Sequence, residues 1–92
     1  MIDVTPADFH KLYGGLVRML RAIEQAGPAG LTTNQAGVKV FNSRGYGWKI
    51  LNQADQMGYI TREQVDNNNY YVVNRLTAKG RKLLRDLDAN GN

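Results

Sequence analysis

The stretch from Phe41 to Ile60 constrains the fold most strongly, because a helical pattern ends there and an extended one begins. Its apolar residues recur at helical spacing and predict one buried stripe, formed by Ile50, Leu51, Ala54 and Met57. Asn42 or Ser43 is suited to cap the start of this helix with a side-chain oxygen. Gly58 is suited to end it in a left-handed conformation. The sequence therefore predicts a helix over about residues 43–57 that leads into a strand.

The opposite side of this predicted helix is basic, aromatic and rich in amides, with no acid before Asp55. It carries Arg44, Tyr46, Trp48, Lys49, Asn52 and Gln53. Arg, Asn and Gln can contact base edges through two hydrogen bonds, and Lys can neutralise phosphate. Trp48 could belong to the core, as a single Trp in a small domain usually does, but it is out of phase with the apolar stripe, which favours exposure. Gly45 and Gly47 fall in the first turns and weaken the helix there.

The N-terminal part of the chain predicts a long helix. Thr5 can cap it and Pro6 suits its first turn. Its apolar residues at helical spacing are Phe9, Leu12, Tyr13, Leu16, Leu20 and Ile23, with Val17 and Met19 on the two flanks. So wide a stripe fits either a helix buried on two sides within one chain or a helix that partly meets a second subunit. Gly14-Gly15 in mid-helix indicates either close approach of another backbone or a local kink.

A helix-turn-helix pattern follows. Gly27 to Gly30 end the first helix, and residues 31–34 resemble a new helix cap. A short helix over residues 35–40 follows, with Ala36 and Val40 facing inward, and residues 41–43 form the turn into the next helix. Two helices joined by a tight turn, the second polar and basic on its outer side, are typical of DNA-binding helix-turn-helix units.

After Ile60 the pattern predicts a β-hairpin and a last helix. The strands are residues 61–65 and 70–76, and the loop between them contains Asn67, Asn68 and Asn69. Asn74 interrupts the apolar side of the second strand. Thr77 can cap the last helix, with Gly80, Leu83, Leu84 and Leu87 inward and Lys79, Arg81, Lys82 and Arg85 outward. We expect an ordered core over about residues 6–87 and a frayed tail over 88–92.

The 92 residues fit a single domain, residues 1–92, with a small core. The net charge is +4, and two segments free of acid carry most of the basic residues. One is residues 25–54, with Lys39, Arg44 and Lys49, and the other is residues 67–85, with Arg75, Lys79, Arg81, Lys82 and Arg85. These two basic blocks can form a patch if the fold brings them to one side.

Several classes of function are disfavoured by the sequence. There is no cysteine, and His10 is the only histidine, so we expect no metal site. No nucleophile–base–acid set, phosphate-binding glycine loop or cofactor motif occurs, so we expect no enzyme activity and no cofactor. No signal peptide or membrane-length apolar run is present, and we expect a soluble cytoplasmic protein.

The order of elements is that of a winged helix-turn-helix domain: an α+β fold, mostly α, with a three-helix core, a β-hairpin wing and a C-terminal helix. Residues 50–60, ILNQADQMGYI, resemble the end of the recognition helix running into the wing. Residues 76–84, LTAKGRKLL, are similar to the Leu-Thr-x-x-Gly-Arg segment that follows the wing in transcription regulators of the MarR and PadR types. The resemblance covers roughly residues 9–87, but the long flanking helices by which many MarR-type proteins dimerise are missing.

The resemblance implies a nucleoid-associated regulator that binds double-stranded DNA as a homodimer, which could form through the first helix. Major-groove positions are occupied by Ser43, Arg44, Tyr46, Trp48, Lys49 and Gln53. Thr32, Thr33 and Asn34 stand where the supporting helix meets phosphate. Arg62 and the loop residues Asn67, Asn68 and Asn69 stand where a wing reaches the backbone or the minor groove. The alternatives are a protein-interaction winged helix in a larger assembly, or a single-strand binder that uses Tyr46 and Trp48.

Overall fold

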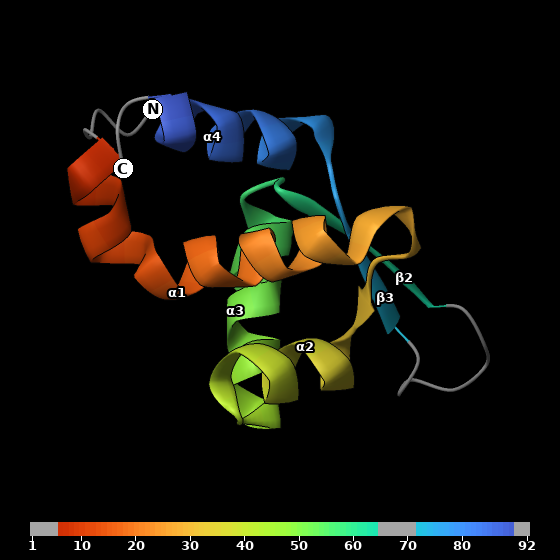
Figure 1. Cartoon of the computed structure of the whole chain (residues 1–92). Coiled ribbons are helices and arrows are strands. Elements are labelled where there is room, and N and C mark those ends of the chain that lie inside the picture. Colours follow the sequence, from red (N-terminus) through yellow and green to blue (C-terminus); the bar gives the residue numbers. More distant parts are fainter. Residues whose placement is uncertain (1–5, 65–71, 90–92) are drawn as a thin grey trace.

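The computed structural model describes residues 6–64 and 72–89, and the side chains from Tyr13 onward within these ranges. Its elements, in chain order, are α1 (Pro6–Ala26), the 3-10 turn η1 (Gly27–Ala29), β1 (Leu31–Thr32), α2 (Thr33–Phe41), α3 (Arg44–Gln56), β2 (Ile60–Gln64), β3 (Val72–Leu76) and α4 (Ala78–Ala89) (Figure 1). This order confirms the predicted winged helix-turn-helix fold, which is mostly helical with a small sheet.

The sheet is antiparallel and has the strand order β1-β3-β2. In the hairpin, Ile60 pairs with Leu76 and Gln64 with Val72. The strand β1 was not predicted: Leu31 and Thr32 pair with β3, and Thr32 is at the same time the cap of α2. A strand of two residues is too short to show the alternation by which strands are recognised in a sequence. The predicted loop, with Asn67, Asn68 and Asn69, lies outside the described residues.

The core forms around the second half of α1, which in Figure 1 crosses α3 and has α4 along one side. Its buried residues are Leu16, Val17, Met19, Leu20 and Ile23. They pack with residues from the other elements, including Leu51, Ala54, Ile60, Leu84 and Leu87. Val17 and Met19, on opposite flanks of the stripe, are 2% and 0% exposed. Over these residues α1 is therefore buried on two sides within one chain.

The first helix bends at the glycine pair. Tyr13 has φ −128° and ψ 33°, which are not helical values, so the bend falls immediately before Gly14. Gly15 faces α3: a Cβ there would lie 3.3 Å from the hydroxyl oxygen of Tyr46, whereas a Cβ on Gly14 would meet nothing within 4 Å. The local kink is therefore the explanation that applies, and the close approach of another backbone is wrong, since the neighbours of Gly15 are side chains.

The last helix closes the core from the other side of α1. Gly80, Leu84 and Leu87 are buried, and Leu83 is partly buried, as predicted. The expectation of a frayed tail from residue 88 is wrong for its first two residues, since α4 continues to Ala89. Arg21 of α1 pairs with Asp88 at 2.9 Å, and this ion pair joins the last turn of α4 to α1.

Candidate nucleic-acid interface

The turn between α2 and α3 is fixed by side-chain caps and one left-handed residue. The Thr32 hydroxyl accepts a hydrogen bond from the Gln35 amide, and the Gln35 side chain accepts one from the Thr32 amide, which makes a capping box. Asn42 ends α2 with a φ of 53°. The Ser43 hydroxyl then accepts a hydrogen bond from the Tyr46 amide at 3.2 Å. Of the two predicted caps of α3, Ser43 is therefore the one used, while Asn42 supplies the turn.

The outer face of α3 is exposed and polar. Trp48 is 56% exposed, so of the two alternatives for this residue the exposed one applies. It lines a shallow surface hollow of about 370 Å³ together with Lys49, Asn52, Gln53 and Gln56. We call these five residues the α3 outer face. Gln56 was not among the predicted contact residues, although its position four residues after Asn52 places it on the same side of a helix.

Tyr46 and Trp48 lie on different flanks of α3. The Tyr46 ring meets the Phe41 ring edge-on, with the ring centres 4.6 Å apart and an angle of 81°. It therefore leans toward α1 and α2, whereas Trp48 joins the α3 outer face. Side chains two positions apart on a helix do not face each other. The two aromatic rings consequently do not form one stacking platform, and this weakens the alternative of a single-strand binder that uses both.

The two basic blocks have different environments. Within the described part of the chain, no hydrogen bond or ion pair engages Lys39, Arg44 or Lys49, whose side chains are exposed. Two cations of α4, by contrast, are engaged: Lys79 donates to the Met57 carbonyl at 2.7 Å, and Lys82 pairs with Asp86 at 2.9 Å. Figure 1 shows α4 and α2 near opposite ends of α3. The cations of α2 and α3 therefore lie away from those of α4, and the two basic blocks do not form one continuous patch.

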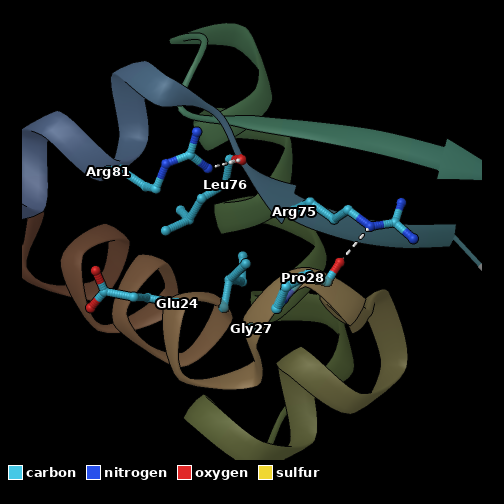
Figure 2. A pocket seen from close by; sticks show the side chains of 7 residues that line it. Glu24, Gly27, Pro28, Arg75, Leu76 and Arg81 are labelled. Atoms are coloured by element: carbon cyan, nitrogen blue, oxygen red, sulfur yellow. Dashed lines mark hydrogen bonds between the residues drawn. The ribbon is translucent and has the colours of Figure 1, made fainter.

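A second hollow, of about 310 Å³, lies where α1, β3 and α4 meet (Figure 2). Figure 2 shows two arginines at its edge, each hydrogen-bonded to a backbone carbonyl. Arg75 donates from Nε to the Pro28 carbonyl at 3.0 Å, and Arg81 donates to the Leu76 carbonyl at 3.2 Å. Both guanidinium groups thus connect segments of the chain at this edge. These two members of the second basic block are therefore hydrogen-bonded within the domain.

The Arg62 side chain points into the domain rather than out from the surface of the wing. Its guanidinium donates from Nε to Asn74 Oδ1 at 2.9 Å, and its two terminal nitrogens donate to Asn52 Oδ1 at 2.6 Å and to Thr33 Oγ1 at 2.9 Å. One side chain thus joins β2 to β3, α3 and α2. The resemblance implied that Arg62 reaches the DNA backbone or the minor groove; its guanidinium instead hydrogen-bonds to three side chains of the domain itself.

Asn74 is the buried member of the network, at 0% exposure. Its Nδ2 donates to the Leu31 carbonyl at 3.0 Å and to Thr33 Oγ1 at 3.3 Å, so it also ties β1 to β3. This explains why a polar residue interrupts the apolar side of β3. Burial lowers the pKa of the Arg62 guanidinium, and the negative charge of Asp55 acts in the opposite direction. Arginine remains charged at neutral pH, so a half-buried cation stands where α2, α3 and β2 meet.

The start of α2 lies beside this cation. The Thr32 hydroxyl belongs to the capping box, and the Thr33 hydroxyl belongs to the Arg62 network. Thr33 and Asn34 are the first two residues of the helix, whose backbone N–H groups have no partner within a helix. Among the described residues, no group of acidic or histidine side chains could hold a metal ion. None of the described helices is both long enough and apolar enough to cross a membrane.

The geometry of α1 to α4 is that of the winged helices of MarR-type regulators, as solved structures of low sequence identity show. A mutant of MepR from S. aureus, bound to an oligodeoxyribonucleotide, is 17% identical with a TM-score of 0.77, and the match covers 88% of this chain and 60% of that one. A mutant of MarR from E. coli, complexed with operator DNA, is 19% identical with a TM-score of 0.72, and the match covers 96% and 56%.

A third structure has a length closer to that of this chain. AF1382 from Archaeoglobus fulgidus is 21% identical with a TM-score of 0.69, and the match covers 87% of this chain and 89% of that one. This chain thus spans just over half of the MarR chain and three-fifths of the MepR chain. No protein-family model matches the sequence, and no curated protein matches it. These likenesses establish the winged-helix fold.

Proposed function

We propose that this chain is a transcription regulator that binds double-stranded DNA sequence-specifically, with α3 in the major groove. The observation that carries the proposal is the α3 outer face: an exposed tryptophan, a lysine and three amides on one side of the second helix of a helix-turn-helix unit. Amide side chains can read base edges, and Lys49 can meet phosphate. The MepR and MarR structures of the same fold, both solved with DNA, support the proposal.

The proposed contacts extend from α3 to both sides. Ser43, Arg44 and Tyr46 would lie at the start of α3, and Trp48, Lys49 and Gln53 along its outer face. Thr32, Thr33 and Asn34 would approach a phosphate through the start of α2. The hairpin tip, with Asn67, Asn68 and Asn69, would touch the flanking backbone. Arg62 is not included among these proposed DNA contacts, because its guanidinium is hydrogen-bonded inside the domain.

We further propose that two copies bind the two halves of a pseudo-palindromic site, as expected for a helix-turn-helix protein. Such a regulator would act in the cytoplasm, on the nucleoid. Leu16, Val17, Met19, Leu20 and Ile23 are already buried within the chain, so a contact between subunits through α1 would use other residues. The spacing between half-sites, read from selected DNA, would report whether two copies bind together.

The experiment is a selection of duplexes from a random pool, followed by fluorescence anisotropy at several salt concentrations. Arg44→Ala should reduce discrimination by the roughly 1–3 kcal/mol of a good base contact. Lys49→Ala should weaken binding to all duplexes and reduce the salt slope by about 0.9 log units per log salt. Lys82→Ala is the matched control, since Lys82 is ion-paired on α4, and it should bind as the wild type does.

A second function is favoured by one observation, the exposure of Trp48 at 56% and Val38 at 51%. These side chains could contact a partner protein if the chain is an interaction module. An apolar interface responds little to salt, whereas phosphate contacts weaken steeply with it. A wild-type protein that selects no duplex would overturn the DNA proposal in favour of this alternative, and unchanged binding of Arg44→Ala and Lys49→Ala to a selected duplex would overturn the placement of α3 in the major groove.

A further inference from the structure

The chemistry of the Arg62 side chain fixes the orientation of its neighbours. A guanidinium group has only N–H donors and no acceptor. The atoms that face it must therefore be oxygens, as observed for Asn52 Oδ1 at 2.6 Å, Thr33 Oγ1 at 2.9 Å and Asn74 Oδ1 at 2.9 Å. For the two asparagines, this determines which end of the amide points toward Arg62 and which end points away.

For Asn52, the consequence reaches the proposed DNA surface. Asn52 lies on α3 and lines the hollow of the α3 outer face. Since its Oδ1 is turned toward Arg62, the NH₂ group is what the amide offers on the side of the hollow. A two-bond contact with adenine requires both an acceptor and a donor at the base edge. Arg62 uses one of the two lone pairs of Oδ1 and turns this oxygen toward β2, so the amide cannot present donor and acceptor together at one base edge and its NH₂ group is the end left free.

For Thr33, both lone pairs of the hydroxyl oxygen are used. Oγ1 accepts a hydrogen bond from Arg62 at 2.9 Å and another from Asn74 Nδ2 at 3.3 Å. A hydroxyl has two lone pairs and one proton, so the proton of Thr33 remains for a third partner. Thr33 is also the first residue of α2, where backbone N–H groups point away from the helix. The junction of α2, α3 and β2 therefore presents donors.

We propose that Arg62 is a positioning residue that makes this junction donor-only toward DNA, so that Asn52 selects a base carrying a hydrogen-bond acceptor in the major groove and Thr33 binds a phosphate oxygen. The acceptors available to Asn52 are N7 of either purine, O6 of guanine and O4 of thymine. The inference rests on the proposed function, because it requires DNA against α3. It adds Asn52 to the specificity-determining residues and removes Arg62 from the direct contacts.

The test compares the base preferences of the wild type, Asn52→Ala, Arg62→Met and the double variant, each selected from the same random pool of duplexes. Asn52→Ala removes the donor, and Arg62→Met frees the amide to turn over. Both should relax discrimination at the same base pair, by about twofold to tenfold, as expected for one hydrogen bond. The double variant should relax it no further than the single variants, because all three remove the same oriented donor.

Two results would overturn the inference. Arg62→Met could leave every base preference intact and lower the salt slope by about 0.9, which would make Arg62 a direct phosphate contact. Alternatively, Asn52→Ala could change no position. Asn52→Asp guards against misfolding of Arg62→Met: a carboxylate keeps the acceptor for Arg62 but has no donor. It should keep the stability of the wild type and relax the same base pair, and unchanged discrimination in this variant would also contradict the inference.

A measurement without DNA separates this inference from the proposed function. In an NMR spectrum of the free protein, the Asn52 side-chain amide protons should exchange readily with water. Those of Asn74, which donate to Leu31 and Thr33 in the interior, should be protected. Protected Asn52 protons would overturn the inference even if the protein binds DNA. Failure to select any duplex would instead overturn the proposed function, while the orientation of Asn52 would still be measured by this experiment.

Discussion

Gly37 of α2 and Gly47 of α3 pack backbone against backbone, and a Cβ built on Gly47 would overlap the Cα of Gly37. Both residues are buried. A Cβ on Gly37 would likewise lie 2.8 Å from the Ser43 carbonyl oxygen. The helix-turn-helix unit is therefore held at a distance that only glycine permits on both sides of the contact. This spacing sets how far the α3 outer face stands out from α2.

We predict that Gly47→Ala destabilises the protein, although alanine is the better helix former by about 1 kcal/mol. The added methyl group must push α2 and α3 apart, and overpacking of this kind costs about 1–3 kcal/mol. The free energy of unfolding, measured by urea denaturation, should fall by that amount.

Gly45→Ala is the matched control, because it lies in the same helix and a Cβ there would meet nothing within 4 Å. It should raise the free energy of unfolding, by up to about 1 kcal/mol. Equal effects of the two substitutions would show that the contact between Gly37 and Gly47 is not tight.

These glycines also show what could be predicted from the sequence and what could not. Local patterns predicted the helices and the hairpin and favoured the exposure of Trp48. Apolar spacing and helix caps depend only on residues that are close in the sequence, which is why they could be recognised. From the sequence, Gly47 is only a residue that destabilises α3. Its role in the close packing of α2 against α3 depends on its contact with Gly37, which is not visible in the sequence. The pairing of β1 with β3 is hidden for a related reason, since Leu31 and Asn74 are distant in sequence.

In the candidate site, too, some features could be predicted from local sequence patterns and others could not. Arg44, Trp48, Lys49 and Gln53 could be placed on the outer side of α3 from helical phase alone. The inward direction of Arg62 could not, because it depends on Thr33, Asn52 and Asn74, which come from three other elements. One signal was present: a polar residue, Asn74, at an inward position of β3 indicates a buried partner.

We predict that Asn74→Ala lowers the free energy of unfolding by about 1–3 kcal/mol, because it leaves buried polar groups without partners. Arg62 Nε loses its acceptor and the Leu31 carbonyl loses a donor. Urea denaturation would measure the change. Asn52→Ala is the comparison: it removes one contact of Arg62 at a partly exposed residue, so its effect should be smaller. A larger loss for Asn52→Ala would place the centre of the network elsewhere.

We predict that Thr77→Ala destabilises the junction between the wing and α4. The Thr77 hydroxyl donates to the Gly58 carbonyl at 2.7 Å and accepts from the Gly80 amide at 3.1 Å. It therefore caps α4 and holds the turn after α3 with one oxygen. Loss of a cap of this kind costs about 0.5–2 kcal/mol, measurable by thermal or urea unfolding. Thr77→Ser retains both hydrogen bonds and should lie close to the wild type; a serine variant as unstable as the alanine variant would point to the lost methyl group instead.

We predict that stability falls in alkaline solution through Tyr59, which lies between α3 and β2. Burial raises the pKa of its phenol above the ordinary value of 10.0, and Tyr13 raises it further. The unfolded chain therefore releases this proton at a lower pH than the folded chain does. As pH rises from about 10 toward the folded-state pKa, the unfolded state binds fewer protons and is favoured, so the free energy of unfolding decreases.

Tyr59→Phe tests this dependence, since phenylalanine keeps the ring that Lys79 Nζ approaches at 5.1 Å from its centre but cannot ionise. Urea denaturation of both proteins between about pH 8 and pH 11 should show a constant difference at the lower end, where both states of the wild type are protonated. Above about pH 10 the wild type should lose stability more steeply than Tyr59→Phe. Parallel curves across the whole range would mean that Tyr59 titrates alike in the folded and unfolded chains, and that its partial burial carries no cost for the ionised form.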